Sequence, residues 1–153
     1  MPEITIRDAV EEDLHIIHMI EEKIYQTPWT FNFFRIMFHT NEGLFIVATS
    51  EGNIVGYTIG EIEIMGRADM KRNAGHVMNV AVQSDYQGKG VGTMLLDELE
   101  VRFIKRGASV AYLEVRESNT RAQQIYRNRG YHYVRTSENY YSDEDGYIMT
   151  KRL

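Results

Sequence analysis

Hydrophobic and polar residues alternate with several different periods along the chain, and each period predicts a different element. Residues 3–7 alternate one by one, which is typical of a half-buried strand. From about Asp13 the period becomes that of an amphipathic helix. We expect this helix to break at residues 25–30, because Pro28 lacks a backbone donor and restricts Thr27 before it. The apolar residues expected on its inner side are Leu14, Ile17, Met19, Ile20 and Ile24.

A second helix is predicted from Thr30, whose hydroxyl can cap it, through Phe38. Two apolar runs, residues 43–49 and 54–64, flank a Glu-Gly-Asn turn and therefore predict a hairpin. Residues 66–73 are polar and indicate a loop. Several aromatic residues lie around the break between the two helices. Core packing is the ordinary interpretation of these aromatics, and the wall of a substrate pocket is the alternative.

The centre of the chain predicts a strand, a glycine turn and a helix in direct succession. Residues 76–82 form a valine-rich run that suits a strand buried on both faces. Gly88, Gly90 and Gly92 follow it, and such a turn can take positive φ while the helix start offers free N–H groups to a phosphate. Lys89 adds positive charge, although a tight turn without any ligand is the alternative. The apolar stripe of the helix consists of Val91, Leu95, Leu99 and Phe103.

The helix is expected to end at Gly107, where a C-cap glycine belongs. The next apolar run, residues 108–115, predicts a strand parallel to the central one, because a helix joins the two. The last two strands, residues 131–135 and 147–152, are expected to pair around an acidic loop at 142–146. These elements together predict an α/β (α+β) fold with a mixed sheet.

A further helix is predicted before that last pair of strands. Asn119 or Thr120 can cap its start, and Gly130 can end it. The residues expected on its inner face are Ala122, Ile125 and Tyr126. The chain shows no repeat, linker or low-complexity tract, so residues 1–153 are expected to form a single domain.

Composition narrows the classes of function. The chain has no cysteine, which excludes disulfides, a cysteine zinc site and a cysteine nucleophile, and no metal site is expected. Its net charge of -5 argues against a nucleic-acid surface and weakly favours small ligands or cationic substrates. No run is long enough to span a bilayer, and residues 1–8 carry acids where a signal peptide needs an apolar core, so a cytoplasmic protein is expected.

The spacing of the glycines restricts which phosphate-binding turn this is. A P-loop needs G-x-x-x-x-G-K-[ST] and a dinucleotide fingerprint needs G-x-G-x-x-G, and residues 88–92 satisfy neither pattern. Residues 87–92, Gln-Gly-Lys-Gly-Val-Gly, resemble the acetyl-CoA signature [RQ]-x-x-G-x-[GA] of the GNAT acetyltransferases. Residues 113–131 resemble the LEVR block of RimI-type N-terminal acetyltransferases. Residues 75–82 and the pair Tyr140-Tyr141 are similar to segments of archaeal and eukaryotic N-terminal acetyltransferases.

This resemblance covers essentially the whole chain and implies the GNAT fold. That fold has a mixed central sheet of about seven strands, flanked by about four helices, with splayed central parallel strands. The resemblance also implies that acetyl-CoA binds through the main chain of the central strand and the glycine turn. The residues implied in cofactor binding are Val80, Ala81, Val82, Gln87, Gly88, Lys89, Gly90, Val91, Gly92, Thr93, Asn119 and Tyr126.

Acetyl transfer to an amine requires a group that takes the amine proton, a donor to the developing oxyanion and a donor to the leaving thiolate. The resemblance implies that Glu114 is the general base and that His76 can share this role through an ordered water. It implies Tyr126 as the general acid, while the backbone N–H of Val82 is the expected oxyanion donor. A structural salt bridge of Glu114, a core histidine at His76 and a core tyrosine at Tyr126 are the alternatives.

The same resemblance implies protein N-termini as the acceptor, ribosomal proteins among the candidates. The expected substrate contacts are Tyr25, Pro28, Trp29, Met78, Asn79, Tyr140 and Tyr141. Residues 26–29 lack the glutamate of the archaeal broad-specificity enzymes, which leaves the accepted N-terminal residues open. The oligomeric state and any association with the ribosome or an auxiliary subunit are open as well. Two alternatives stand beside this function: an acetyltransferase for a small amine, polyamine or lysine side chain, and a module that binds acyl-CoA without catalysis.

Overall fold

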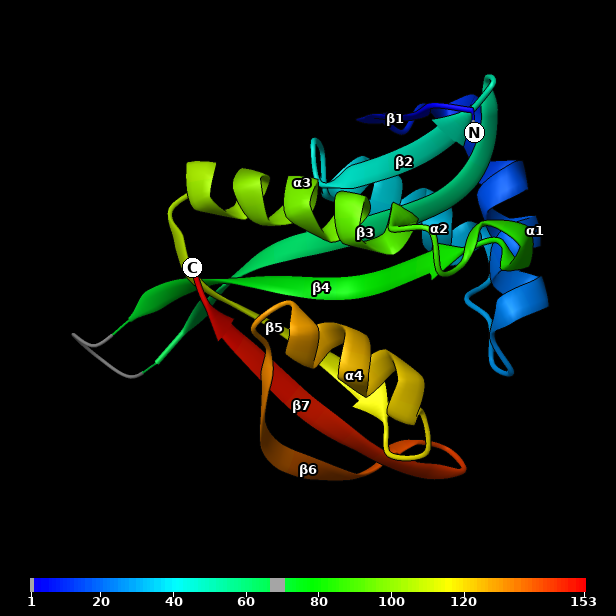
Figure 1. Cartoon of the computed structure of the whole chain (residues 1–153). Coiled ribbons are helices and arrows are strands. Elements are labelled where there is room, and N and C mark those ends of the chain that lie inside the picture. Colours follow the sequence, from blue (N-terminus) through cyan, green and yellow to red (C-terminus); the bar gives the residue numbers. More distant parts are fainter. Residues whose placement is uncertain (1, 67–70) are drawn as a thin grey trace. The chain divides into compact units, whose positions relative to one another are not determined.

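The computed structural model describes residues 2–66 and 71–153, and its order of helices and strands is the predicted one (Figure 1). The helices are α1 (Leu14–Ile24), α2 (Phe31–Thr40), α3 (Val91–Lys105) and α4 (Thr120–Asn128). The strands are β1 (Ile4–Asp8), β2 (Phe45–Ser50), β3 (Asn53–Met65), β4 (Arg72–Val82), β5 (Ala108–Arg116), β6 (His132–Tyr141) and β7 (Glu144–Arg152). Short 3-10 turns at Glu11–Asp13 and Ser84–Tyr86 add to these elements.

The strands form a seven-stranded sheet in the order β1-β2-β3-β4-β5-β7-β6. β4 and β5 are parallel, as the connecting helix predicted, whereas β1–β2, β2–β3, β5–β7 and β6–β7 are antiparallel. The parallel register runs only from Asn73↔Ala108 to His76↔Tyr112, which fits the expected splay of this strand pair. The predicted mixed sheet with four helices is therefore confirmed.

The chain divides into two compact units, which are described separately. Unit 1 comprises Met1–Glu61 and Asn79–Arg102, and unit 2 comprises Ile62–Met78 and Phe103–Leu153. That the chain works as a single domain over residues 1–153 stays a prediction.

In unit 1, helices cover both faces of β3. Successive residues of a strand point to opposite faces, so Gly56 and Tyr57 face different ways. A Cβ added at Gly56 would lie 3.3 Å from Leu95 of α3, whereas the Tyr57 ring lies 5.8 Å from the Phe34 ring of α2. Figure 1 shows α3 and α2 on the two sides of this strand. Three residues of the predicted α3 stripe are buried in this unit, namely Val91, Leu95 and Leu99, and the fourth, Phe103, is buried in unit 2.

In unit 2, β5 and β7 present one buried face and one open face. Leu113 pairs with Met149, and both are buried on the side that α4 covers in Figure 1. Tyr112 and Glu114, the neighbours of Leu113 on β5, point to the other face and line a cavity. The last turn of α3 packs on β4 at Gly75, where any Cβ would clash with the Phe103 ring at 2.2 Å.

Several local predictions were wrong, among them the predicted strand 131–135, because β6 continues to Tyr141. Met19 and Ile125 were expected to face inward, but they are 52% and 42% exposed. β4 begins at Arg72, so the predicted loop 66–73 is too long at its end, and its residues 67–70 lie outside the described residues. The acidic loop at 142–146 is also shorter than predicted, because β7 begins at Glu144.

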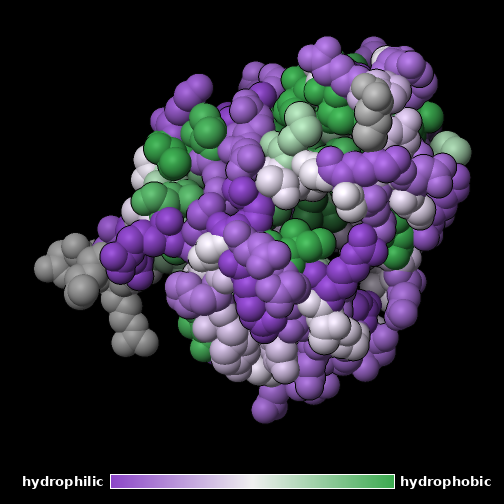
Figure 2. Space-filling model, viewed as in Figure 1, coloured by the Kyte–Doolittle hydropathy of each residue, from purple (hydrophilic) through white to green (hydrophobic). Residues whose placement is uncertain are grey.

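The surface is mostly polar on the face in view (Figure 2). Figure 2 shows hydrophilic residues over most of the face in view, with hydrophobic residues in separate patches. The most exposed large hydrophobic residues include Ile64, Ile104 and Met19. Among the described residues, the helices are too short or too polar for any of them to cross a membrane.

Candidate active site

The glycine turn of unit 1 has the backbone conformation that the sequence predicted. Gly88 and Gly90 have φ of 75° and 84°, a left-handed region that favours glycine, and α3 begins immediately afterwards at Val91. The Gln87 side chain donates a hydrogen bond of 2.9 Å to the carbonyl of Val82 and so ties the turn to the end of β4. Lys89 lies over the Tyr86 ring at 5.6 Å. The Gln87 side chain therefore has a partner in the protein itself, which the prediction of a cofactor-binding role did not include.

Within unit 1, a buried carboxylate holds the segment between α1 and α2, which carries Pro28 and Trp29. Glu21 on α1 is 1% exposed. Its Oε2 accepts a hydrogen bond of 2.9 Å from the backbone N–H of Trp29. Its Oε1 accepts one from the Tyr57 hydroxyl and one of 2.7 Å from the Asn79 side-chain amide. Burial first, and then the charge of Glu21, raise the pKa of Tyr57, so its hydroxyl stays a donor.

A neighbouring contact also joins this segment to β4, since the Tyr25 hydroxyl donates to the carbonyl of Val80 at 2.5 Å. Beside it, the Thr58 hydroxyl on β3 donates to the carbonyl of Asn79 at 2.8 Å. Thr30 caps α2 as predicted, since its hydroxyl accepts from the backbone N–H of Phe33 at 3.1 Å. The side chains of Tyr25 and Asn79 are therefore engaged within unit 1, and their predicted contact with substrate stays a prediction.

In unit 2, two predicted catalytic residues are in direct contact. Nε2 of His76 lies 2.7 Å from Oε1 of Glu114, and their side chains are only 15% and 11% exposed. His76 comes from β4 and Glu114 from β5, the parallel pair that the sequence predicted. The two side chains are thus in direct contact, and the predicted role of His76 toward the amine through an ordered water stays a prediction.

A second carboxylate, which the sequence analysis missed, also contacts His76. Nδ1 of His76 lies 2.9 Å from Oε2 of Glu63, which also accepts a 2.5 Å hydrogen bond from the Tyr112 hydroxyl. The Tyr112 ring stacks on the imidazole at 4.3 Å with an interplanar angle of 4°. Both ring nitrogens thus face a carboxylate, and a neutral imidazole can donate to only one of them. A possible signal was the alternation of glutamate with isoleucine at the end of β3.

The predicted tyrosine pair lies at the tip of the β6–β7 hairpin, near Glu114. The charge of Glu114 and a hydrogen bond to it, together with burial as the largest cause, raise the pKa of Tyr140. Tyr140 and Tyr141 are in edge-to-face contact at 4.9 Å. The guanidinium of Arg116 lies over the Tyr141 ring at 4.3 Å.

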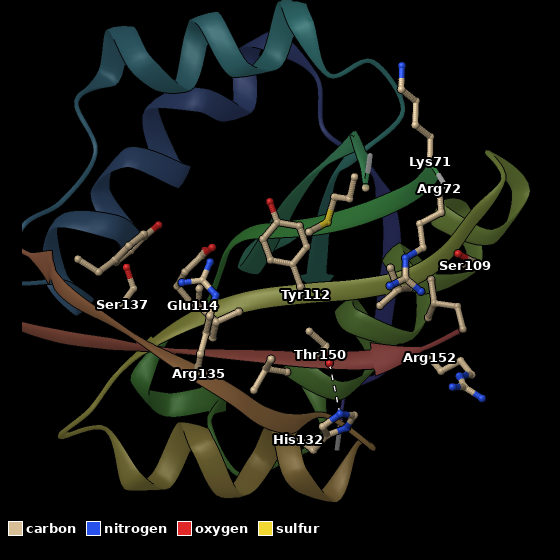
Figure 3. Close-up of a pocket in the computed structure, with 17 residues that line it drawn as sticks. Lys71, Arg72, Ser109, Tyr112, Glu114, His132, Arg135, Ser137, Thr150 and Arg152 are labelled. Carbon is tan, nitrogen blue, oxygen red and sulfur yellow. Dashed lines mark hydrogen bonds between the residues drawn. The ribbon is translucent and has the colours of Figure 1, made fainter. Parts of the chain in front are cut away.

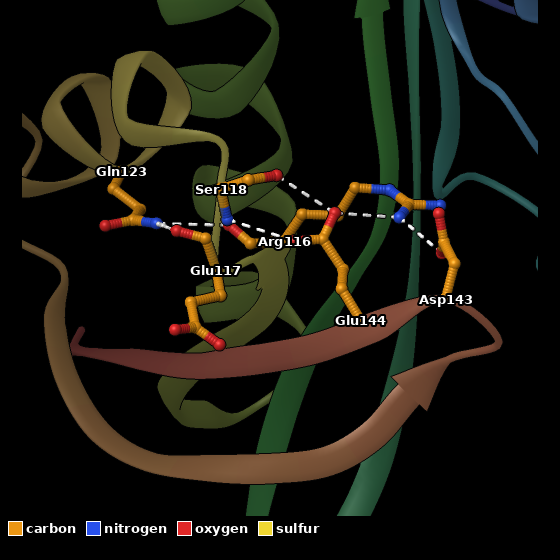
Figure 4. A network of polar contacts seen from close by, with 6 residues as sticks. All are labelled: Arg116, Glu117, Ser118, Gln123, Asp143 and Glu144. Atoms are coloured by element: carbon orange, nitrogen blue, oxygen red, sulfur yellow. Dashed lines mark hydrogen bonds and ion pairs between the residues drawn. The ribbon is translucent and has the colours of Figure 1, made fainter.

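Arg116 anchors the turn of this hairpin (Figure 4). Its Nη1 lies 2.8 Å from Asp143 and 2.9 Å from Glu144, and Ser118 donates a further hydrogen bond to Glu144. The hydrogen bonds from Arg116 lower the pKa of both carboxyl groups, which therefore stay ionised near neutral pH. The acidic residues thus hold the hairpin together instead of forming a free loop.

Tyr126 on α4 is not in contact with the catalytic pair. Its ring packs edge-on against Tyr131 at 6.0 Å, and among the described residues it makes no hydrogen bond to Glu114 or His76. Burial raises its pKa, so the hydroxyl keeps the proton that a general acid needs. Asn119 caps α4 by accepting from the N–H of Ala122 at 3.1 Å. The roles of Tyr126 and Asn119 toward a cofactor stay predictions, as does that of the half-buried Met78.

Comparison with known proteins assigns this arrangement to a family. The acetyltransferase (GNAT) family matches residues 9–131. The chain belongs to the GNAT acetyltransferase family. It is 33% identical to an N-alpha-acetyltransferase of Sulfurisphaera tokodaii, over 99% of this chain and 94% of that protein. It is 30% identical to the ribosomal protein bS18-alanine N-acetyltransferase of Escherichia coli, over 93% of this chain and 90% of that protein.

A solved structure agrees with this GNAT assignment. Chaetomium thermophilum Naa20, in complex with a bisubstrate analogue, superposes with a TM-score of 0.88 at 26% identity, over 97% of this chain and 86% of that one. The glycine turn has room for the pyrophosphate of a GNAT cosubstrate. A Cβ built at Gly88 or Gly90 meets nothing within 4 Å, so an external group can approach this backbone closely. The first N–H groups of α3 and the charge of Lys89 suit an anion there.

Proposed function

We propose that this protein transfers the acetyl group of acetyl-CoA to the free α-amine of protein N-termini. Membership of the GNAT family supports the cosubstrate, and the relatives named above support the class of acceptor. The observation that carries the proposal is the carboxylate of Glu114. It is partly buried, touches His76, and still lines an open cavity together with Tyr140.

Acetyl-CoA supplies an activated thioester, so that the amide C–N bond forms while the C–S bond breaks. Glu114 takes the proton that the attacking amine must lose. His76, held between Glu63 and Glu114, keeps the carboxylate oriented and can pass the proton on. The Tyr126 hydroxyl, which burial keeps protonated, donates to the departing sulfur. The absence of cysteine agrees with direct attack, because no cysteine nucleophile can carry the acetyl group.

An α-amine suits this site better than a lysine side chain does. Its pKa of about 8, against about 10.4 for lysine, leaves far more neutral amine near pH 7. A peptide N-terminus is therefore easier for Glu114 to deprotonate than a lysine side chain. Tyr140 and Tyr141, whose rings and hydroxyls can contact a peptide backbone, lie next to this carboxylate.

The test is mass spectrometry on three acceptors incubated with acetyl-CoA: free N-terminal peptides, N-blocked peptides that contain lysine, and a polyamine. We expect acetylation of the free α-amine and little of the others. Glu114→Gln should lower kcat about a hundredfold or more without changing acetyl-CoA affinity. The matched control is Glu117→Gln, an exposed carboxylate three residues later, which should keep full rate. Preferential acetylation of blocked lysine peptides or of the polyamine would overturn the proposal.

A further inference from the structure

One face of the sheet in unit 2 carries more than the catalytic carboxylate. The open sides of β5, β7 and β6 line a cavity of about 1370 Å³ (Figure 3). The register arranges its side chains in rows across the strands. The first row is Glu114, Ile148 and Arg135; the second is Tyr112, Thr150 and His132; the third is Val110 and Arg152.

The charges that line this face are mostly positive. Arg72, Arg135 and Arg152 line it together with Lys71, whereas Glu114 is the anionic side chain of the lining. The salt bridges found among the described residues involve none of these three arginines. All three are exposed. Since the whole chain has a net charge of -5, this face differs in sign from the average of the molecule.

The floor between these charges is apolar, since Val110, Ile148 and Val134 line it. Figure 3 shows Glu114 and Arg135 at one end of the face and Arg72 and Arg152 at the other. An apolar strip with a positive border suits an extended acidic peptide, because the peptide backbone and side chains cover the strip and its carboxylates meet the guanidinium groups. We call this surface the basic face and define it by Arg72, Arg135 and Arg152.

The strand register also gives the distances from Glu114 to the arginines, and hence which residues of a bound peptide can contact them. Neighbouring strands lie about 4.8 Å apart, so the backbone of Arg135, two strands from Glu114, lies about 10 Å away. Arg152 lies one strand over and four residues along, or about 14 Å away. An extended substrate advances about 3.3 Å per residue. With its α-amine at Glu114, its third to fifth residues therefore reach these arginines.

We propose that the basic face binds acidic side chains at about the third to fifth residue of the substrate polypeptide. This inference rests on the proposed function and adds to it a preference that lies beyond the acetylated residue. Two other occupants fit less well. A second copy of the chain would bring arginines against arginines if it used the same face, and a nucleic acid would meet the Glu114 carboxylate and a net-negative protein.

The test uses the full chain, acetyl-CoA and three peptides that share their first two residues. Residues three to five are Glu, Gln or Lys in the three peptides. We expect a KM about fivefold lower for the Glu peptide than for the Gln peptide, which is the range of one or two exposed ion pairs. The Lys peptide should have the highest KM. The differences should shrink in 0.5 M salt, because salt screens exposed charges.

The variant Arg135→Gln/Arg152→Gln should bring the ratio of the Glu and Gln KM values close to one. The control is Arg121→Gln on α4, an exposed arginine that does not line the cavity and should leave the ratio unchanged. Equal KM values for the three peptides in the unaltered protein would overturn the inference while leaving the proposed function intact. A preference that persists in the double variant, a dimer that blocks peptide binding, or tighter binding of an oligonucleotide would overturn it too. If no peptide is acetylated, the proposed function itself fails.

Discussion

Replacing Glu21 is the most direct test of how unit 1 holds the segment between its first two helices. Three donors from three parts of the chain converge on this buried carboxylate: the N–H of Trp29, the hydroxyl of Tyr57 and the amide of Asn79. Glu21→Leu keeps the size of the side chain but removes both acceptors. Glu21→Gln keeps one acceptor and adds two donors.

The two variants should lose clearly different amounts of the free energy of unfolding. A buried donor left without a partner costs about 1–3 kcal/mol. The Tyr57 hydroxyl is buried and the other two donors are part-buried, so Glu21→Leu should lower the free energy of unfolding by about 2–3 kcal/mol. In Glu21→Gln the remaining oxygen can serve the N–H of Trp29. Tyr57 can turn to accept, and the Asn79 amide can flip to present its oxygen. The loss should then be about 1 kcal/mol, since mainly the strength of the charged hydrogen bonds disappears.

Urea unfolding measures both losses, and an unchanged m-value shows that the folded and unfolded states stay comparable. Tyr57→Phe is the control that removes one donor and its partner bond together. Since Glu21 also fixes Trp29, the Leu variant should have a higher peptide KM than the Gln variant. A loss below about 1 kcal/mol in Glu21→Leu would refute the reasoning, because it would mean that the three donors find water or other partners.

Three further predictions concern the candidate site. Gly90→Val should raise the acetyl-CoA dissociation constant tenfold or more, about 1.4 kcal/mol, by calorimetry. The control Gly52→Val, at a similar φ of 81° in the β2–β3 turn, should share the backbone strain but keep the acetyl-CoA affinity of the unaltered protein. If Gly90→Val also keeps that affinity, the glycine turn is purely structural. Glu63→Gln should lower kcat about tenfold without raising the peptide KM, because the partner of His76 Nδ1 loses its negative charge; a full rate would make that charge dispensable. Burial raises the pKa of Tyr141 to about 12, so its stabilising contribution is present below about pH 10 and falls between pH 10 and 12. The difference in unfolding free energy between the wild type and Tyr141→Phe should shrink over that range, and a constant difference would contradict the assignment.

The sequence predicts most of this fold because hydrophobic periods report burial directly. The α3 stripe, the β2–β3 hairpin and the parallel β4–β5 pair all follow from apolar spacing and from glycine positions. Apart from the exposed Met19 and Ile125, the clearest error lies where polar residues are satisfied by distant partners. Residues 142–146 look like a free acidic loop, yet Arg116, 27 and 28 residues before its acidic partners, supplies the charge that lets β7 begin at Glu144.

The candidate site shows the same limit. Glu114 and His76 could be predicted because a motif marks them, and the structure brings their side chains together. Glu63 and Glu21 have no such motif. Each is defined by partners from other parts of the chain, at sequence separations from 8 to 58 residues for Glu21, and no local pattern encodes those contacts.

Glu21 and Glu114 also show why burial alone does not identify a catalytic carboxylate. Both interrupt apolar stretches, and either one would be costly to bury without partners. Glu21 is fully enclosed, and donors from the protein bind both of its oxygens, so an incoming amine finds no room there. Glu114 is held by His76 but remains on the wall of an open cavity. An amine can therefore reach the Glu114 carboxylate while His76 keeps it in place. Proton transfer needs that access, and of these two glutamates Glu114 has it.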